Sequence, residues 1–263
     1  MTTEPAGGGL AGALRTWRTR RRVSQLELAA RAGTTQRHVS FIESGRSAPG
    51  RSMIIRLAES LEVPIRERNE LLLAAGFAPA YPQRDLDDPQ LAPVRAALDR
   101  ILHGHLPFPA VIVDRYGDLV AANAGFDLLT RGVDAGLLAA PVSVPRLLLH
   151  PGGLAPRIVN LDEWAWHIID RVHAESLRNP SDRLRSLAEE LTTLAPPRPR
   201  QLSAQHLGFA VPLQLRMDDR ELRLITTLTH FGTATDVTIA ELRLEAFLPA
   251  DDATSVALNE LVR

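Results

Sequence analysis

The chain has 263 residues, no cysteine and a formal net charge of −1, but its charge is unevenly distributed. Residues 1–80 carry 12 arginines and 7 glutamates, whereas residues 81–263 carry 18 arginines and 24 acidic residues. The composition excludes disulfides, cysteine nucleophiles and cysteine-ligated zinc, and because the sequence holds neither a leader peptide nor an apolar run of about 18 residues, we expect a cytoplasmic protein without a membrane span.

The basic first third and the acidic remainder predict two domains with different tasks. A positively charged module attracts phosphate groups, so the arginine-rich part is the candidate for binding nucleic acid. A small helical DNA-binding unit needs about 70 residues, which leaves enough chain for a second domain with a core of its own.

The first predicted helix carries Leu10, Leu14 and Trp17 on one face and ends in arginines at positions 18 and 20–22. Two interpretations of the arginines fit equally well. They form a solvated face that complements the negative helix C-terminus, or they contact phosphate.

Residues 24–45 contain two short helical patterns on either side of a glycine. Ser24 and Glu27 have the spacing of a capping box, which predicts a helix start at this point. Gly33 ends that helix, because a left-handed backbone carries no Cβ penalty in glycine.

The second helix of this segment is expected to begin after Thr34 or Thr35 and to bury Val39 and Ile42 on one face. An ordinary pair of packed helices would show the same elements. The arginine and glutamine on the free face, with basic residues on the flanks, favour a helix-turn-helix whose second helix enters the major groove of DNA.

This segment resembles the helix-turn-helix of phage-repressor-type regulators, the XRE family. The resemblance runs from about Leu10 to Phe77 and is most specific at TTQ (34–36), IESG (42–45) and RLAESLEVP (56–64). It implies a DNA-binding domain over residues 9–77. Residues at the start of the second helix reach deepest into the groove, so Gln36 and Arg37 are expected at base edges and Phe41 at a thymine methyl. Gln25, Thr35 and Arg46 are expected to contact phosphates.

Two further helices are predicted to complete this domain, one capped by Ser52 and one opened by Pro64. The proline-rich residues 78–93 are predicted to be a linker. A helix from Val94 then leads into the second domain, which we place at residues 94–263.

The second domain opens with a hairpin pattern around the turn at residues 116–118, followed by a helix that Asn123 can cap. Asn160 and Glu163 form another capping box and predict a long helix, and Asn179-Pro180 predicts the next one.

Three strand patterns follow a proline-rich break. They alternate at residues 209–217, 222–231 and 240–248, with one face predicted for the core and one for water. In the last of them, the aliphatic residues that include Leu242 and Leu244 were expected on the core face, opposite Arg243 and Glu245. The order of elements predicts a PAS-like α/β (α+β) domain with one antiparallel sheet.

Residues 109–251 resemble the ligand-binding domain of MmyB-like transcription regulators. The resemblance rests on PAVIVDRYGDLVAANAGFDLL (109–129), RLLLHPGGLAPRIVNLDEW (146–164) and FGTATDVTIAELRLEAFLPAD (231–251). It implies a PAS-like domain that holds a fatty-acid-like or other apolar small molecule. Residues 196–208 differ from the aromatic-rich segment that many relatives have at this place. The details of that part of the relatives' pocket wall are therefore not expected in this chain.

Aliphatic and aromatic residues on the apolar faces of the predicted strands and helices are the candidate pocket walls. They are Val111, Val113, Phe126, Trp164, Ile168, Leu213, Leu215, Leu224, Leu242 and Leu244. The candidate polar anchors are Arg146, Arg157 and Asn160, and a helix-capping role is slightly favoured for Asn160.

Motifs for catalysis and metal binding are absent from the sequence. It contains no P-loop, dinucleotide fingerprint, Gly-x-Ser-x-Gly or His-Glu-x-x-His, and His103 and His105 lack a third ligand nearby. We therefore expect no enzyme activity, no metal and no cofactor.

Two functions are left open by the sequence. The first is a homodimeric regulator that binds double-stranded operator DNA and senses an apolar ligand. The second is a regulator whose second domain only dimerises around a solid core. Apolar strand faces look the same in both cases.

Overall fold

The structure is a computed structural model that describes residues 9–199 and 210–262. The chain divides into two compact units, the first formed by the residues up to Asp85 together with 233–240, and the second by residues 86–232 and 241–263. Within the described residues, no helix is long and apolar enough to cross a membrane.

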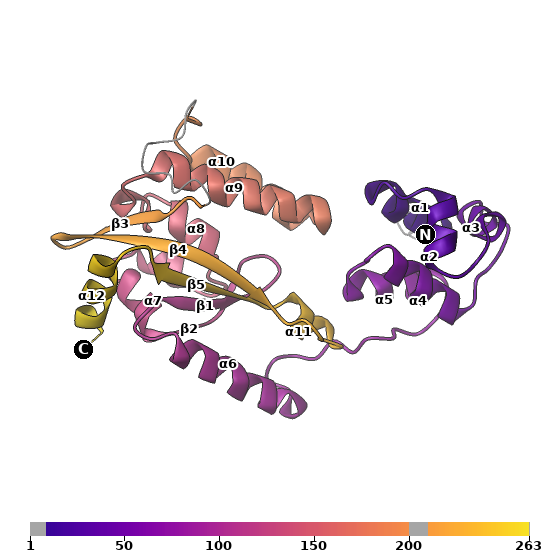
Figure 1. The fold of residues 1–263 in the computed structure, drawn as a ribbon, viewed down its shortest axis with the longest axis horizontal. Helices are drawn as coiled ribbons and strands as arrows, with labels where there is room; N and C mark the ends of the chain where they lie inside the picture. Colours follow the sequence, from indigo (N-terminus) through magenta and orange to yellow (C-terminus); the bar gives the residue numbers. More distant parts are fainter. Residues whose placement is uncertain (1–8, 200–209, 263) are drawn as a thin grey trace, which may run out of the picture. The chain divides into compact units, whose positions relative to one another are not determined.

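The first unit is built from short α-helices (Figure 1). They are α1 Leu10–Arg20, α2 Gln25–Arg31, α3 Gln36–Glu43, α4 Arg51–Ser60, α5 Ile65–Ala74 and, from a distant part of the sequence, α11 Val237–Glu241. The predicted capping residues lie at the N-termini of α2 and α3. Ser24 Oγ accepts the amide of Glu27, and Thr35 Oγ1 accepts the amide of His38. Helix α4, however, begins at Arg51 after Gly50, so Ser52 lies inside the helix and is not its cap.

The core of the first unit is aliphatic. Leu14 and Trp17 of α1, Leu28 of α2, and Val39 and Ile42 of α3 are all at most 7% exposed. Each such side chain contributes about 2 kcal/mol by leaving water. Burial of the α3 aliphatic pair therefore fixes which face of α3 remains free.

Hydrogen bonds and an ion pair within the first unit join the linker to α11 and the residue before it. The amide of Val237 donates to the carbonyl of Pro82 (2.8 Å), and Arg84 pairs with Asp236 at 2.9 Å. Thr238 Oγ1 donates to the carbonyl of Arg84 (2.6 Å). The segment at residues 236–238 therefore holds the linker, which the sequence did not indicate.

The second unit is a five-stranded antiparallel sheet with helices on both faces (Figure 1). Its strands are β1 Ala110–Val113, β2 Leu119–Ala122, β3 Leu213–Met217, β4 Arg220–His230 and β5 Arg243–Pro249, in the order β2-β1-β5-β4-β3. This result confirms the predicted fold class of an all-α helix-turn-helix domain followed by an α/β domain with an antiparallel sheet. Phe209, expected in the strand pattern of residues 209–217, lies outside the described residues.

Helices α8, α9 and α10 lie on one side of the sheet and α6 on the other (Figure 1). The helices of this unit are α6 Ala92–Gly104, α7 Ala124–Leu129, α8 Val144–Leu149, α9 Leu161–Arg178, α10 Asp182–Leu194 and α12 Asp252–Leu261, with 3-10 turns at Pro89–Leu91, Ala135–Leu138 and Ala155–Arg157. Asn123 caps α7 as predicted, its Oδ1 accepting the amide of Phe126.

Asn160 does not cap α9 as the capping-box prediction required. Its Nδ2 donates to the carbonyl of Pro212 (2.8 Å) and its Oδ1 accepts the amide of Gln214 (3.0 Å). The side chain is buried beside the entry to β3, where unpaired backbone groups are costly, so it bonds the strand and leaves the helix end without a side-chain cap.

The face of β5 that carries Arg243 and Glu245 is the one that points toward α9. The prediction had put Leu242 and Leu244 on that side. Val111 and Val113 of the core lie opposite Glu245 and Arg243 of β5, and directly opposite residues of an antiparallel pair point to the same face. Leu244 therefore lies on the α6 side with Ile112, and neither Leu242 nor Leu244 belongs to the main core. Alternation along a strand defines two faces. It does not tell which face a helix will cover, and here α9 covers the charged face because it carries residues of opposite charge.

Candidate DNA-binding surface and ligand site

The first turn of α3 presents exposed polar side chains beside the positive end of the helix. Gln36 and Arg37 are both exposed, as predicted for residues that reach base edges. The guanidinium of Arg37 lies 5.1 Å from the ring centre of Phe41, one turn later. Phe41 therefore supports Arg37, and its half-buried ring is less free to reach a base than the sequence suggested.

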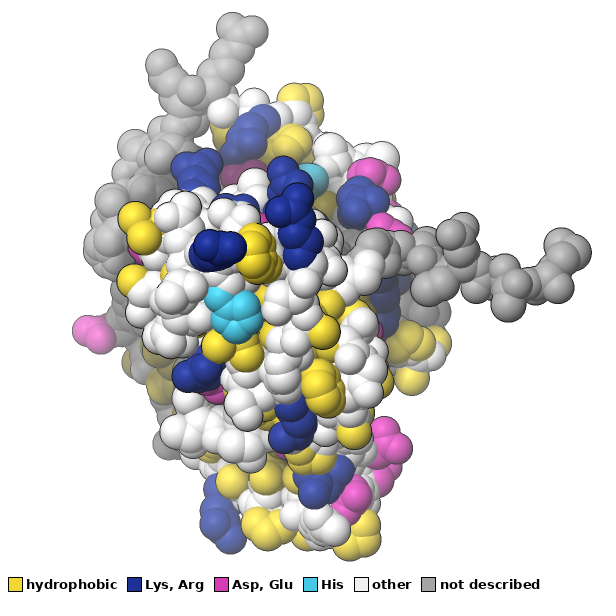
Figure 2. All heavy atoms as spheres, turned by 90° about the vertical axis from the view of Figure 1, so that its right-hand side faces the viewer, with side chains coloured by type: hydrophobic (Ala, Val, Ile, Leu, Met, Phe, Trp, Pro, Cys, Tyr) yellow, Lys and Arg dark blue, Asp and Glu magenta, His cyan; other side chains and the backbone are white. Residues whose placement is uncertain are grey.

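Figure 2 shows the side of the molecule on which α3 lies in Figure 1, where arginines are spaced over a surface of mostly uncharged atoms. Arg46, after the end of α3, is exposed. The hydroxyl of Thr35 accepts the helix-capping bond from the amide of His38, and a hydroxyl that accepts still has one hydrogen to donate. These two residues flank α3 at opposite ends.

An ion-pair network beneath this surface holds α1, α2 and α3 together. Arg18 donates to both carboxylate oxygens of Glu43 (2.7 and 3.0 Å), and Gln25 Nε2 donates to one of them (2.8 Å). Burial alone would raise the pKa of Glu43, but the hydrogen bonds from Arg18 and Gln25 outweigh it and lower that pKa. The bond to Glu43 raises the pKa of Arg18.

The arginine run after α1 is largely occupied by the protein itself. Arg18 binds Glu43, Arg21 donates to the carbonyl of Glu62 (2.8 Å), and Arg20 lies over the ring of Trp17 at 5.7 Å. Of the two interpretations that the sequence left open, these contacts favour the structural one.

Eight of the ten predicted wall residues meet in one core of the second unit. Val111, Val113, Phe126, Trp164, Ile168, Leu213, Leu215 and Leu224 are each at most 2% exposed. They pack against one another, so a ligand between the sheet and α9 would have to displace them. Trp164 Nε1 is buried there and bonds no other described group.

The three predicted anchors are not brought together. Arg157 donates to the carbonyl of Leu129, and burial lowers its pKa. Asn160 binds β3, as described above. Arg146 binds Glu190 through two hydrogen bonds of 2.6 Å, which lower the pKa of that carboxyl.

Arg146 lines a cleft of about 170 Å³ at the β1–β2 turn. Tyr116 and Asp118 of the turn form one side, and Leu184, Leu187 and other residues of α10 form the other. The cleft is separate from the predicted apolar site, because none of the ten wall residues lines it.

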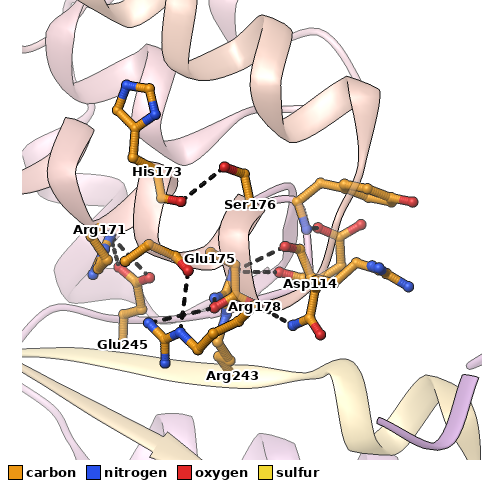
Figure 3. Close-up of polar contacts among 12 residues, drawn as sticks. Asp114, Arg171, His173, Glu175, Ser176, Arg178, Arg243 and Glu245 are labelled. Carbon is orange, nitrogen blue, oxygen red and sulfur yellow. Dashed lines mark hydrogen bonds and ion pairs between the residues drawn. The ribbon is translucent and has the colours of Figure 1, made fainter. Parts of the chain in front are cut away.

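Charged side chains also cross between the sheet and α9 (Figure 3). Glu245 of β5 pairs with Arg171 at 3.2 Å, and Arg243 pairs with Glu175 at 3.5 Å. Arg243 also donates to the carbonyls of Asp114 and Arg115 (3.2 Å each), while burial raises the pKa of the Asp114 carboxyl. These pairs explain how β5 can turn two charged residues toward the helices.

Two family models match the chain. A helix-turn-helix family matches residues 14–68, and the ligand-binding domain of MmyB-like transcription regulators matches residues 94–261, which is well over half of the sequence. The chain belongs to the MmyB-like transcription regulators. It is therefore a DNA-binding transcription regulator with a domain for a small-molecule ligand. Both matched families are families of regulators and not of enzymes.

The MmyB-like regulator was also compared with curated proteins and with solved structures. No curated protein matches the chain. A solved structure described as an RNA-binding light-oxygen-voltage receptor is 14% identical, with 96% of this chain and 61% of that chain covered, at a TM-score of 0.26. The regulator thus spans less than two thirds of that protein, and so low a score carries no argument.

Sequence reasoning missed several residues of the regulator's sites. His38 of α3 bonds Thr34 through Nδ1 (3.0 Å), which the four-residue spacing could have indicated. Glu43 lies one turn after the buried Val39, so its position on the inner face of α3 was also detectable. The charges of β5 were visible, but their partners on α9 are more than 60 residues away in sequence.

Proposed function

We propose that this regulator recognises operator DNA through the first turn of α3. Gln36 and Arg37 contact base edges, and Phe41 contacts a thymine methyl while it supports Arg37. Thr35, Gln25 and Arg46 contact phosphates, with Gln25 fixed in place by its bond to Glu43. The exposure of Gln36 and Arg37 beside the positive helix end is the observation that supports this assignment most strongly.

Two alanine variants test the operator assignment on a site selected from random duplexes. Arg37→Ala should cost about 1–3 kcal/mol and relax the preference at one base pair. Arg46→Ala should weaken binding to all sequences and reduce the salt dependence, because it removes a phosphate contact. If both variants bound the selected site as the parent protein does, the assignment would be wrong.

The second unit is proposed to sense an apolar, fatty-acid-like molecule between the sheet and α9. The buried, unpartnered Nε1 of Trp164 supports the proposal, because a lone donor in an apolar core costs about 1–3 kcal/mol and a ligand carboxyl or carbonyl would satisfy it. The alternative is a unit that only dimerises. The close packing of the eight wall residues favours that alternative.

A binding titration separates these two functions. Delipidated protein is titrated with alkanoic acids of medium and long chain and with alkanes of the same length, while operator affinity is followed. Saturable uptake of acids but not alkanes, weakened in Trp164→Phe, supports ligand sensing, with an operator effect of about 5–150-fold. If no acid were taken up, the second unit would have no ligand-sensing function, and the alternative that it only dimerises would stand.

The regulator is also proposed to act as a homodimer on a two-fold operator. One eight-residue recognition helix reads few base pairs, so useful specificity needs two. The acidic second unit is the proposed interface, because the first unit must leave its arginines free for DNA.

A further inference from the structure

The cleft at the β1–β2 turn is large enough for a small metabolite. A cavity of about 150 Å³ accommodates benzene, and this cleft measures about 170 Å³. Its walls come from three separate segments, the β1–β2 turn, the start of α8 and helix α10, all within the second unit. Its size suits an occupant of roughly the dimensions of a single amino acid or a similar molecule.

Charges of both signs line the cleft in equal number. Arg146 pairs with Glu190, and Arg183 pairs with Asp118. Nε and Nη2 of Arg146 hold the two oxygens of Glu190, so within the described part of the chain its Nη1 has no partner. The two ion pairs sum to zero charge, so a ligand with a net charge would leave the cleft unbalanced, whereas a zwitterion adds no net charge and still offers a group of each sign.

One lining residue of the cleft, Ser143, has a buried hydroxyl with no partner among the described residues. Ser143, at the residue before α8, is 7% exposed, and its Oγ bonds no other described group. It makes no capping bond to the helix. A buried hydroxyl is nearly always hydrogen-bonded, so this one points to a polar atom that arrives with a ligand.

The remaining wall has an apolar part from α10, beside the hydroxyl residue Ser186. Leu184 and Leu187 of α10 are 2% and 8% exposed, and the ring of Tyr116 carries Arg183 at 4.4 Å on one face. This wall suits a short hydrocarbon group next to the charged one. We propose that the cleft binds a free α-amino acid with an aliphatic side chain, its carboxylate at Arg146 and Ser143 and its ammonium at Asp118 and Glu190.

This site goes beyond the acyl site proposed above and does not depend on it. Binding to the full chain is measured without DNA by calorimetry, using L-valine and L-leucine. The controls are leucinamide, which lacks the carboxylate, and 4-methyl-2-oxopentanoate, which lacks the ammonium group. Saturable binding of the amino acids, at least tenfold tighter than of either analogue, supports the site.

Three variants locate the binding. Glu190→Gln and Ser143→Ala should each weaken amino-acid binding at least fivefold. Arg220→Gln removes a comparable exposed ion pair with Glu260 outside the cleft and should change binding less than twofold. Ser143→Ala should also unfold no earlier than the parent protein in the absence of ligand, because it removes an unsatisfied hydroxyl, so a loss of binding there is not a folding defect.

Each contrary result overturns the proposal. No saturable heat at millimolar amino acid would show that the cleft takes no such ligand. Unchanged affinity in both cleft variants would place the binding elsewhere. Competition by decanoic acid, with equal affinity for the oxo acid, would instead make the cleft the head-group site of the acyl ligand.

Discussion

Glu43 is the residue on which the geometry of the helix-turn-helix depends most. Among the described residues it is the acidic group that receives bonds from both α1 and α2, and only 3% of its side chain is exposed. A buried carboxylate is tolerated only when it is paired, so Arg18 and Gln25 stabilise the position of α3 as well as the charge. The side chains proposed to read DNA are thus oriented by one outside the proposed contact set.

Glu43→Gln should destabilise the first unit by about 2–3 kcal/mol at pH 7, because Arg18 keeps a neutral partner in place of a charged one. The lowered pKa of Glu43 in the folded protein means that its contribution is present above the ordinary carboxyl value of 4.5 and is lost as the pH falls through the folded value. Denaturant unfolding at pH 7 and pH 3 should show a difference between variant and parent that shrinks at the lower pH.

The matched control is Glu59→Gln. Its ion pair with Arg68 leaves 51% of the Glu59 side chain exposed, so the loss should stay below about 1 kcal/mol. An equal effect of the two substitutions, or a Glu43→Gln deficit that is unchanged at pH 3, would argue against the network.

At the scale of elements, α8 and the turn after it depend on a glycine. A Cβ at Gly153 would lie 2.2 Å from the carbonyl oxygen of Leu147, which accepts the amide of Leu154. The turn can bring the chain back onto α8 only because that atom is missing.

Gly153→Ala should therefore lower the stability of the second unit by about 3 kcal/mol, since backbone must move to relieve the overlap. Gly104→Ala is the control, because a Cβ at Gly104, the last residue of α6, meets nothing within 4 Å. Thermal unfolding should show a lower midpoint for the first variant only. Similar midpoints for both would mean that the turn relaxes easily.

The contact between α11 and the linker is a second element-scale feature. The carboxylate of Asp236, of which 8% of the side chain is exposed, binds Arg84 and accepts the amide of Thr238 (2.9 Å). One side chain thus both caps α11 and holds the linker.

Asp236→Ala should raise the amide exchange rate of residues 237 and 238 about tenfold, corresponding to about 1.4 kcal/mol of local opening free energy. Hydrogen exchange read by mass spectrometry measures this directly. Asp219→Ala removes a carboxylate that is 92% exposed and should leave these amides unchanged. Unaltered exchange in the Asp236 variant would show that the backbone bond from Val237 to Pro82 is sufficient alone.

At the scale of the whole molecule, the uneven charge of the chain agrees with the division of tasks. The arginine-rich residues 1–80 form the helix-turn-helix, and the acidic remainder forms the ligand domain. An acidic domain is repelled by the DNA backbone, which agrees with the proposal that its surface binds a second copy of the chain.

A dimer should bind a two-fold operator with half-sites about 10–10.5 bp apart, and insertion of half a helical turn between them should weaken binding at least tenfold. Light scattering at micromolar concentration measures the state of the free protein, and gel shifts measure the complex. A monomer in both experiments, with no effect of half-site spacing, would exclude the dimer.

Local signals in the sequence determined most of the elements and the family. Capping residues, turn glycines and apolar spacing act over a few residues, so Ser24, Gly33, Asn123 and most helix boundaries were predictable, and so was the DNA-binding and ligand-binding character of the regulator. The residues proposed to contact DNA, and the domain boundaries at residues 77 and 94, stay predictions.

Tertiary structure decided what depends on partners far away in the sequence. The face of β5, the strand contacts of Asn160, the Glu43 network and the cleft at the β1–β2 turn each join segments that only the fold brings together. Alternation along a strand gives two equivalent faces, and the choice between them depends on which charges and volumes lie opposite. No local pattern contains that information, because the energy of a buried charge is set by its neighbours in space.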